Sequence, residues 1–173
     1  MGVSTDGLLV YGVDLGEDRE VPWYDYDSDD NEQCLETWWE KLHGINSDDL
    51  WQQYADWEKI HKKEGFEHYE HNSKLIEKFE AEHPEWREAL DKYYLDSKEI
   101  EKSCPVEEVI YCSYDYAMYF LAVKGHSHSA SRGYPKEIKN LEVDKEALQK
   151  ATDFCKKYNI KWEPKWYLAS LWG

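Results

Sequence analysis

Two stretches of β-branched and aromatic residues, Val106–Ser113 and Met118–Lys124, form the clearest pattern along the chain. Each has the length of a strand, and Val, Ile, Tyr and Phe suit a half-buried pleated surface. The polar break Tyr114-Asp115-Tyr116 between them predicts a hairpin. The residues that follow, Gly125–Pro135, are interpreted as a loop. We expect the rest of the chain to pack on this hairpin.

Further elements are predicted on both sides of the hairpin. Strands are expected at Gly7–Leu15 and Trp166–Trp172, near the two ends of the sequence. Apolar residues at helical spacing, together with Ser, Asp, Pro and Gly at the helix ends, predict five helices. These are Glu32–His43, Ser47 to about His61, Phe66–Glu82, Pro84 to about Ser97, and Asp144 to about Asn159.

This order of elements predicts an α+β fold. We expect a small, mainly antiparallel sheet of about four strands, with one C-terminal helix packed on it. A long helical insertion occupies about residues 32–103. With 173 residues, the chain is interpreted as a single α+β domain, 1–173. An independent helical domain is the alternative, although its narrow apolar stripes need a surface to pack against.

The charge is concentrated in the N-terminal third. Residues 1–60 contain 16 Asp/Glu and 3 Lys/Arg, a net charge of −13 out of −16 for the whole chain. Residues 104–173 carry 9 Asp/Glu and 10 Lys/Arg, a net charge of +1. An anionic surface repels nucleic acid and acidic membranes and attracts basic partners. We therefore expect a basic protein surface as partner and no direct binding to nucleic acid. High net charge also serves solubility alone, which is the competing interpretation.

Within this third, the segment Glu17–Asn31 mixes aromatic side chains with carboxylates. Pro22 and the repeated like charges argue against a helix or a central strand, so we expect an extended surface segment. Trp and Tyr often dominate binding interfaces, and the carboxylates around them steer basic partners. The predicted partner-binding residues are Trp23, Tyr24, Asp25, Tyr26, Asp27, Asp29 and Asp30. An ordinary aromatic core beneath a charged exterior is the alternative.

The cellular setting is predicted from the absence of disulfide, secretory and membrane-spanning patterns in the sequence. The four cysteines are scattered without a CxxC pair, and no secretory signal pattern precedes them, which favours reduced thiols in a cytoplasmic protein. No apolar run approaches the roughly 18 residues needed to cross a membrane, so we expect no membrane association. The sequence contains no P-loop, dinucleotide-binding glycine fingerprint, GxSxG or HExxH. We expect no catalytic residues, no resident metal and no cofactor.

The residues after the second hairpin strand form an alternative site. His126 and His128 stand two apart and share a face if the backbone is extended, so both imidazoles could approach one metal or one phosphate. Arg132 could clamp an anion, and Tyr134 lies in a turn beside it. The predicted ligand-binding residues are therefore His126, His128, Arg132 and Tyr134. Two histidines without a third ligand are weak evidence for zinc, and solvated loop residues are the competing interpretation.

Three further groups contain residue types that are suited to metal binding or catalysis. Asp14, Glu17 and Asp18 follow the first strand and could bind Mg²⁺ or serve in acid–base catalysis. His68 and His71 stand three apart on a predicted helix but lack the flanking HExxH motif. Cys112 could act as a nucleophile only if the fold brings a base such as His126 to it, and a core cysteine is the commoner case.

The segments GLLVYGVDLGED, VIYCSYDYAMYFLAVKG with RGYP after it, and WYLASLWG resemble uncharacterised small proteins of tailed bacteriophages. The resemblance covers the two ends of the chain better than residues 32–103. It implies a host-cytoplasm setting and an accessory role, such as interference with host or defence machinery, and it assigns no active residues. We expect a non-enzymatic protein that binds and modulates a host or defence protein. A small-molecule or nucleotide binder, or hydrolase, at His126–Tyr134 is the alternative, and a virion or assembly component is a third hypothesis.

Overall fold

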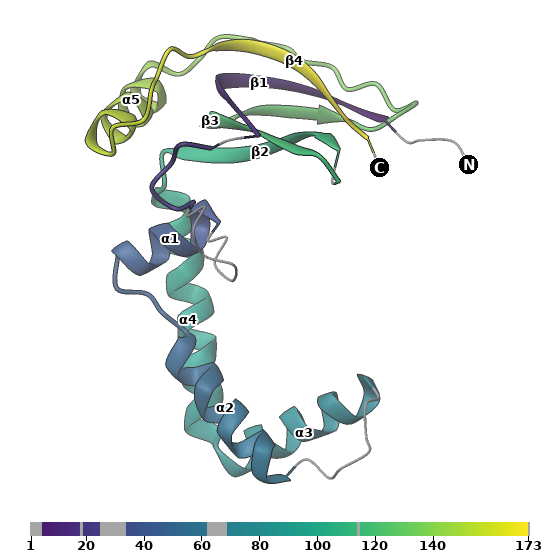
Figure 1. Cartoon of the computed structure of the whole chain (residues 1–173), viewed down its shortest axis with the longest axis vertical. Helices are drawn as coiled ribbons and strands as arrows, with labels where there is room; N and C mark the ends of the chain where they lie inside the picture. The colour runs from purple at the N-terminus through teal and green to yellow at the C-terminus, as the bar shows by residue number, and fades with distance from the viewer. Residues whose placement is uncertain (1–4, 18, 25–33, 62–68, 114, 173) are drawn as a thin grey trace. The chain divides into compact units, whose positions relative to one another are not determined.

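The computed structural model describes residues 5–17, 19–24, 34–61, 69–113 and 115–172. It confirms the predicted α+β class: five helices and four strands lie in these residues (Figure 1). In chain order they are β1 (Thr5–Gly16), α1 (Leu35–Leu42), α2 (Asp48–His61), α3 (Tyr69–Glu82), α4 (Pro84–Ser103), β2 (Val106–Ser113), β3 (Ala117–Ala130), α5 (Lys145–Lys157) and β4 (Lys165–Trp172).

The chain divides into two compact units. The sheet unit consists of Met1–Trp38 and Cys104–Gly173, and the helical unit consists of Trp39–Ser103. The helical unit corresponds closely to the insertion predicted at about 32–103. That the whole chain behaves as a single domain stays a prediction.

The four strands of the sheet unit form a closed barrel in the order β1-β3-β2-β4. The pairs β1–β3, β1–β4 and β2–β3 are antiparallel, as the sequence predicts. Closure comes from a short parallel contact in which Cys112 pairs with Leu171 and Ser113 with Trp172. The barrel therefore has three long antiparallel ladders and one short parallel seam.

The inner face of the barrel is apolar and aromatic. Leu8, Val10, Phe120 and Ala122 form its buried centre, and partly buried side chains from β2 and β4 pack around them. Gly12 lets β1 approach β3 closely, because a Cβ atom at this position would lie 2.1 Å from the carbonyl oxygen of Leu121. Only glycine fits such an approach without displacing a backbone.

The outer face of β3 carries the second layer of this unit. Leu121 and Val123 are fully buried there, since alternate residues of a strand point to opposite faces. Helix α5 packs against this strand and buries Ala151, Phe154 and Cys155. Asp144 caps the helix by accepting a hydrogen bond from the amide of Ala147 at 2.7 Å, as the sequence predicts. Cys155 is a fully buried core residue, and this burial raises the pKa of its thiol to about 12.

The helical unit is built around aromatic side chains. Tyr54 from α2, Phe79 from α3, and Trp86 and Leu90 from α4 form its buried cluster. The indole Nε1 of Trp86 donates a hydrogen bond to the carbonyl oxygen of Leu50 at 2.7 Å, which satisfies the one polar atom of a side chain that is only 2% exposed. These contacts fix the packing of the three helices α2, α3 and α4.

Two predicted boundaries are wrong. Helix α4 ends at Ser103 and not at about Ser97. The loop expected at Gly125–Pro135 is largely strand, because β3 continues to Ala130 and pairs with the first half of β1. Ser127 lies opposite Val10, and His128 lies opposite Leu9. The polar residues suggested a loop, but ladder hydrogen bonds are made by the backbone, and β1 supplies the apolar partners.

None of the helices formed by the described residues combines the length and the apolar character needed to cross a membrane.

Candidate functional site

A pocket of about 380 Å³ lies where β1 and β4 diverge, and we call it the mouth pocket. The antiparallel pairing of the two strands ends at Gly12 and Lys165. Beyond this pair, the end of β1 and the connection from α5 to β4 separate. The residues lining the pocket are Val13, Asp14, Leu15, Glu20, Asn159, Ile160, Lys161, Glu163, Lys165 and Tyr167.

Asp14 is held in a fixed position at the mouth pocket. Its Oδ1 atom accepts a hydrogen bond from the Tyr111 hydroxyl at 2.8 Å and another from the Gly16 amide at 2.9 Å. Burial, followed by the hydrogen bond to Asp14, raises the pKa of Tyr111 well above its ordinary value. Tyr111 therefore stays protonated at neutral pH and acts as a donor that orients the carboxylate.

The aromatic side chains on the inner face extend from Tyr111 to the mouth pocket. The Tyr111 and Phe120 rings stack with centroids 4.2 Å apart, and the Phe120 and Tyr167 rings lie 4.9 Å apart. The ammonium group of Lys165 lies 5.3 Å from the centre of the Tyr167 ring, a cation–π contact. Tyr167 therefore positions a positive charge on the opposite wall of the pocket from the end of β1.

A second pocket, also of about 380 Å³, shares Glu20 and Asn159 with the first and is lined by Arg19 and Tyr24. The guanidinium of Arg19 is buried between two rings, 3.6 Å from the centre of Tyr119 and 4.2 Å from that of Tyr24. Its Nη1 atom lies 3.4 Å from a carboxylate oxygen of Glu108. Removing one partner of such a buried pair is costly, so Arg19 anchors the segment after β1 to the sheet.

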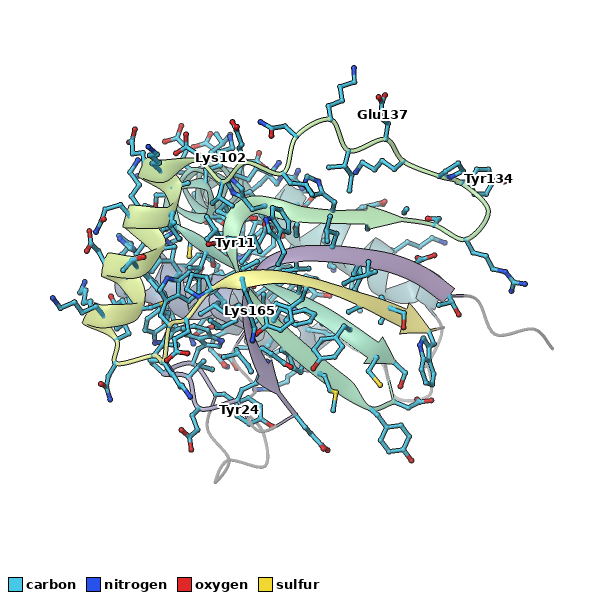
Figure 2. The ribbon with its side chains drawn as sticks, turned by 90° about the horizontal axis from the view of Figure 1, so that it is seen from above. Tyr11, Tyr24, Lys102, Tyr134, Glu137 and Lys165 are labelled. Carbon is cyan, nitrogen blue, oxygen red and sulfur yellow. The ribbon has the colours of Figure 1, made fainter. Side chains whose placement is uncertain are left out.

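The predicted ligand-binding residues do not converge on a pocket described here. His126 lies on β3, and its Nε2 accepts a hydrogen bond from the Asp144 amide at 3.1 Å, which makes it a support of α5. His128 stacks on Trp166 with ring centroids 6.2 Å apart. Tyr134 is 78% exposed and projects from the connection after β3, away from Lys165 (Figure 2).

Arg132 is exposed, and its backbone amide donates to Asp6 at 3.2 Å. Neither the mouth pocket nor the second pocket is lined by any of the four residues. Ligand binding at His126–Tyr134 therefore stays a prediction, and the two pockets give it no support.

The predicted partner-binding residues are only partly described. Trp23 is 3% exposed and packs against Trp38 and Phe154, so it is a core side chain and not a surface contact. Tyr24 is half-buried and lies on Arg19. The remaining predicted residues, Asp25, Tyr26, Asp27, Asp29 and Asp30, lie outside the described residues.

The weaker candidates for chemistry are only partly described. No group of three or more His, Cys, Asp or Glu side chains that could hold a metal ion is found in the described part of the chain. Asp18, His68 and the side chain of His71 fall outside it. Cys104 and Cys155 are buried, Cys112 is partly buried and Cys34 is exposed.

Sequence analysis identified Asp14 but missed the rest of the mouth pocket. Lys165 and Tyr167 are brought to Asp14 by the β1–β4 pairing, and Tyr111 reaches it across the barrel. The alternation within Lys165–Trp172 was the available signal, because it places Lys165 and Tyr167 on the inner face.

The comparisons with known proteins add no relative. No family model matches the chain, no curated protein matches it, and no solved structure matches it.

Proposed function

We propose that the chain is an acidic, non-enzymatic accessory protein of the kind encoded by tailed bacteriophages. It binds a basic surface of a host or defence protein in the host cytoplasm through its acidic N-terminal third and modulates that protein. The proposal has its origin in the net charge of −13 in residues 1–60. Residues 104–173, with a net charge of +1, supply the scaffold.

The observation that carries the proposal is that several of these early carboxylates are exposed without a compensating cation. Glu17, Glu20 and Asp49 are exposed, and within the described residues none of them has a Lys, Arg or His nitrogen within 4.0 Å. Asp48 and Asp56 do have lysine partners, at 3.7 and 2.9 Å. Unpaired exposed carboxylates leave a negative field that accelerates encounters with a basic partner.

Trp23 is excluded from the proposed surface because it is buried. The surface is therefore reduced to Tyr24, Tyr26 and the aspartates at 25, 27, 29 and 30. Among these, the aspartates are the sharpest test, since they supply four charges within six residues.

The experiment compares capture of a bacterial host protein by three forms of the full chain. The test variant replaces Asp25, Asp27, Asp29 and Asp30 with Asn. The control variant removes the same charge from exposed carboxylates elsewhere. Its substitutions are Glu77→Gln, Glu88→Gln, Asp115→Asn and Glu137→Gln. Captured proteins are quantified by mass spectrometry at low and high salt.

We expect a basic protein that the wild type and the control variant capture, that the test variant loses, and that high salt releases. Equal loss in both variants means that bulk charge alone is responsible. Equal capture by all three forms contradicts the proposed surface.

A further inference from the structure

The mouth pocket contains charged side chains of both signs. Asp14, Glu20 and Glu163 supply carboxylates, and Lys161 and Lys165 supply ammonium groups. Within the described residues, no ion pair within 4.0 Å joins any of these five side chains to another. Opposite charges that line one pocket without pairing are available to a ligand that carries both charges.

Of the two charged sides of the mouth pocket, the side with the Asp14 carboxylate has the more fixed geometry. Oδ1 of Asp14 accepts from both Tyr111 and Gly16, and no described group donates to its Oδ2 atom. The carboxylate is thus oriented before any ligand arrives, which reduces the entropy lost on binding. A ligand ammonium is the natural partner for an exposed, preoriented carboxylate.

The cationic side lies on β4. Lys165 is at the point where the β1–β4 ladder ends, and its ammonium group is kept near the Tyr167 ring at 5.3 Å. Lys161, in the connection before β4, adds a second positive charge to the pocket wall. These groups suit a ligand carboxylate, while Val13, Ile160 and Tyr167 add apolar surface to the lining of the pocket.

We propose that the mouth pocket binds a small zwitterion, a free amino acid or a dipeptide. Its ammonium group contacts Asp14, and its carboxylate contacts Lys165. The pocket volume of about 380 Å³ suits such a ligand and lies at the small end of ligand sites, which span roughly 300–1,000 Å³. The tests of the two proposals are separate, because the residues changed here, Asp14 and Lys165, lie outside the segment 25–30.

Two other ligand classes fit the pocket less well. A divalent cation needs several oxygen ligands around one point, and the carboxylates here form no such group among the described residues. A nucleotide or another phosphate carries only negative charge at its recognition end, so Asp14, Glu20 and Glu163 would repel it.

The test is an NMR titration of the full chain with the twenty common amino acids and with di-leucine. Each zwitterion that binds is compared with its two halves, the amine without the carboxylate and the acid without the amine. The same titration is made with Asp14→Asn, which keeps an acceptor for Tyr111, and with Lys165→Met. The matched control is Lys150→Met, because Lys150 lies on α5, where it pairs with Glu146 at 2.7 Å.

We expect at least one zwitterion to shift the amide signals of residues lining the pocket, and each half-ligand to bind at least about tenfold more weakly. Asp14→Asn and Lys165→Met should each weaken binding by at least about tenfold, while Lys150→Met leaves it unchanged.

Three outcomes overturn the proposal. The first is that no zwitterion shifts these signals at millimolar concentration. The second is that Asp14→Asn binds as tightly as the wild type. The third is that inorganic phosphate binds with dependence on Lys165 and none on Asp14, which identifies a simple anion site.

Discussion

Tyr111 couples the ionisation of one phenol to the stability of the sheet unit. Its pKa in the folded state is raised, first by burial and then by the hydrogen bond to Asp14. The folded protein therefore holds this proton more tightly than the unfolded chain does. The contribution to the free energy of unfolding is complete below the ordinary tyrosine pKa of about 10 and is lost as the pH rises above it.

We expect Tyr111→Phe to remove part of this alkaline loss of stability. The measurement is chemical denaturation at a series of pH values between neutral and strongly alkaline. Tyr134→Phe is the control, because Tyr134 is 78% exposed, and its profile should follow that of the wild type. Parallel profiles for Tyr111→Phe and the wild type would show that Tyr111 ionises equally well in both states.

Two glycines on the same strand should respond differently to alanine. At Gly12 a Cβ atom would lie 2.1 Å from the Leu121 carbonyl oxygen, whereas at Gly7 the nearest atom lies at 3.9 Å. We expect Gly12→Ala to lower the free energy of unfolding by at least ~2 kcal/mol, because a backbone must move. Gly7→Ala should stay within ~1 kcal/mol of the wild type. Equal effects in thermal or chemical denaturation would contradict the close approach of β1 and β3.

At the scale of elements, His126 joins β3 to the start of α5. Its Nε2 atom accepts from the Asp144 amide, and its Nδ1 atom lies 3.1 Å from the Lys124 carbonyl oxygen. This arrangement places the ring hydrogen on Nδ1, which then donates to Lys124. The imidazole thus links the strand to the helix cap.

We expect His126→Ala to destabilise the protein by about 1 kcal/mol and to speed hydrogen exchange at the Asp144 amide. His128→Ala is the matched control on the same strand, since His128 makes no hydrogen bond to α5 in the described contacts and stacks on Trp166 instead. Unchanged exchange at Asp144 in His126→Ala would rule out this supporting role.

The elements whose side chains alternate or repeat clearly could be predicted from sequence. Val106–Ser113 was predicted with the bounds it has, and Pro84 begins α4 as expected from its missing N–H. The extension of β3 could not be predicted, because His126–Ser129 is polar. This segment forms a strand because it pairs with Leu8–Val10, which lies more than a hundred residues earlier in the chain.

The sequence could point to individual residues of the mouth pocket, but it could not show that they lie together. Asp14 stood out as an acid at a strand end, but nothing local connects it with Tyr111 or Lys165. Their proximity depends on strand order and on the register that sets Gly12 opposite Lys165. Register is determined by how the whole sheet packs, and a single sequence gives no direct measure of it.

At the scale of the molecule, the two units have separate cores. The sheet unit is centred on Val10 and Phe120, and the helical unit on Tyr54 and Trp86. We expect Trp86→Ala to lower the stability of the helical unit by about 3–5 kcal/mol, because it leaves a large cavity and removes the hydrogen bond from the indole to the Leu50 carbonyl oxygen.

The same substitution should leave the NMR signals of β1–β4 in place. The NMR spectrum of Trp86→Ala is compared with that of Trp172→Ala, which replaces an exposed tryptophan of the sheet unit. Loss of the sheet signals together with the helical ones in Trp86→Ala would instead support the prediction of a single cooperative domain.

The parallel seam has a practical consequence. In the part of the chain that the structure describes, two residue pairs join β2 to β4, Cys112 with Leu171 and Ser113 with Trp172. A truncation before Leu171 would remove both pairs and so open the barrel at the β4-facing edge of β2. Open strand edges recruit strands from other molecules. Shortened forms of this protein should therefore self-associate, and light scattering of a chain ending at Ser170 would detect it.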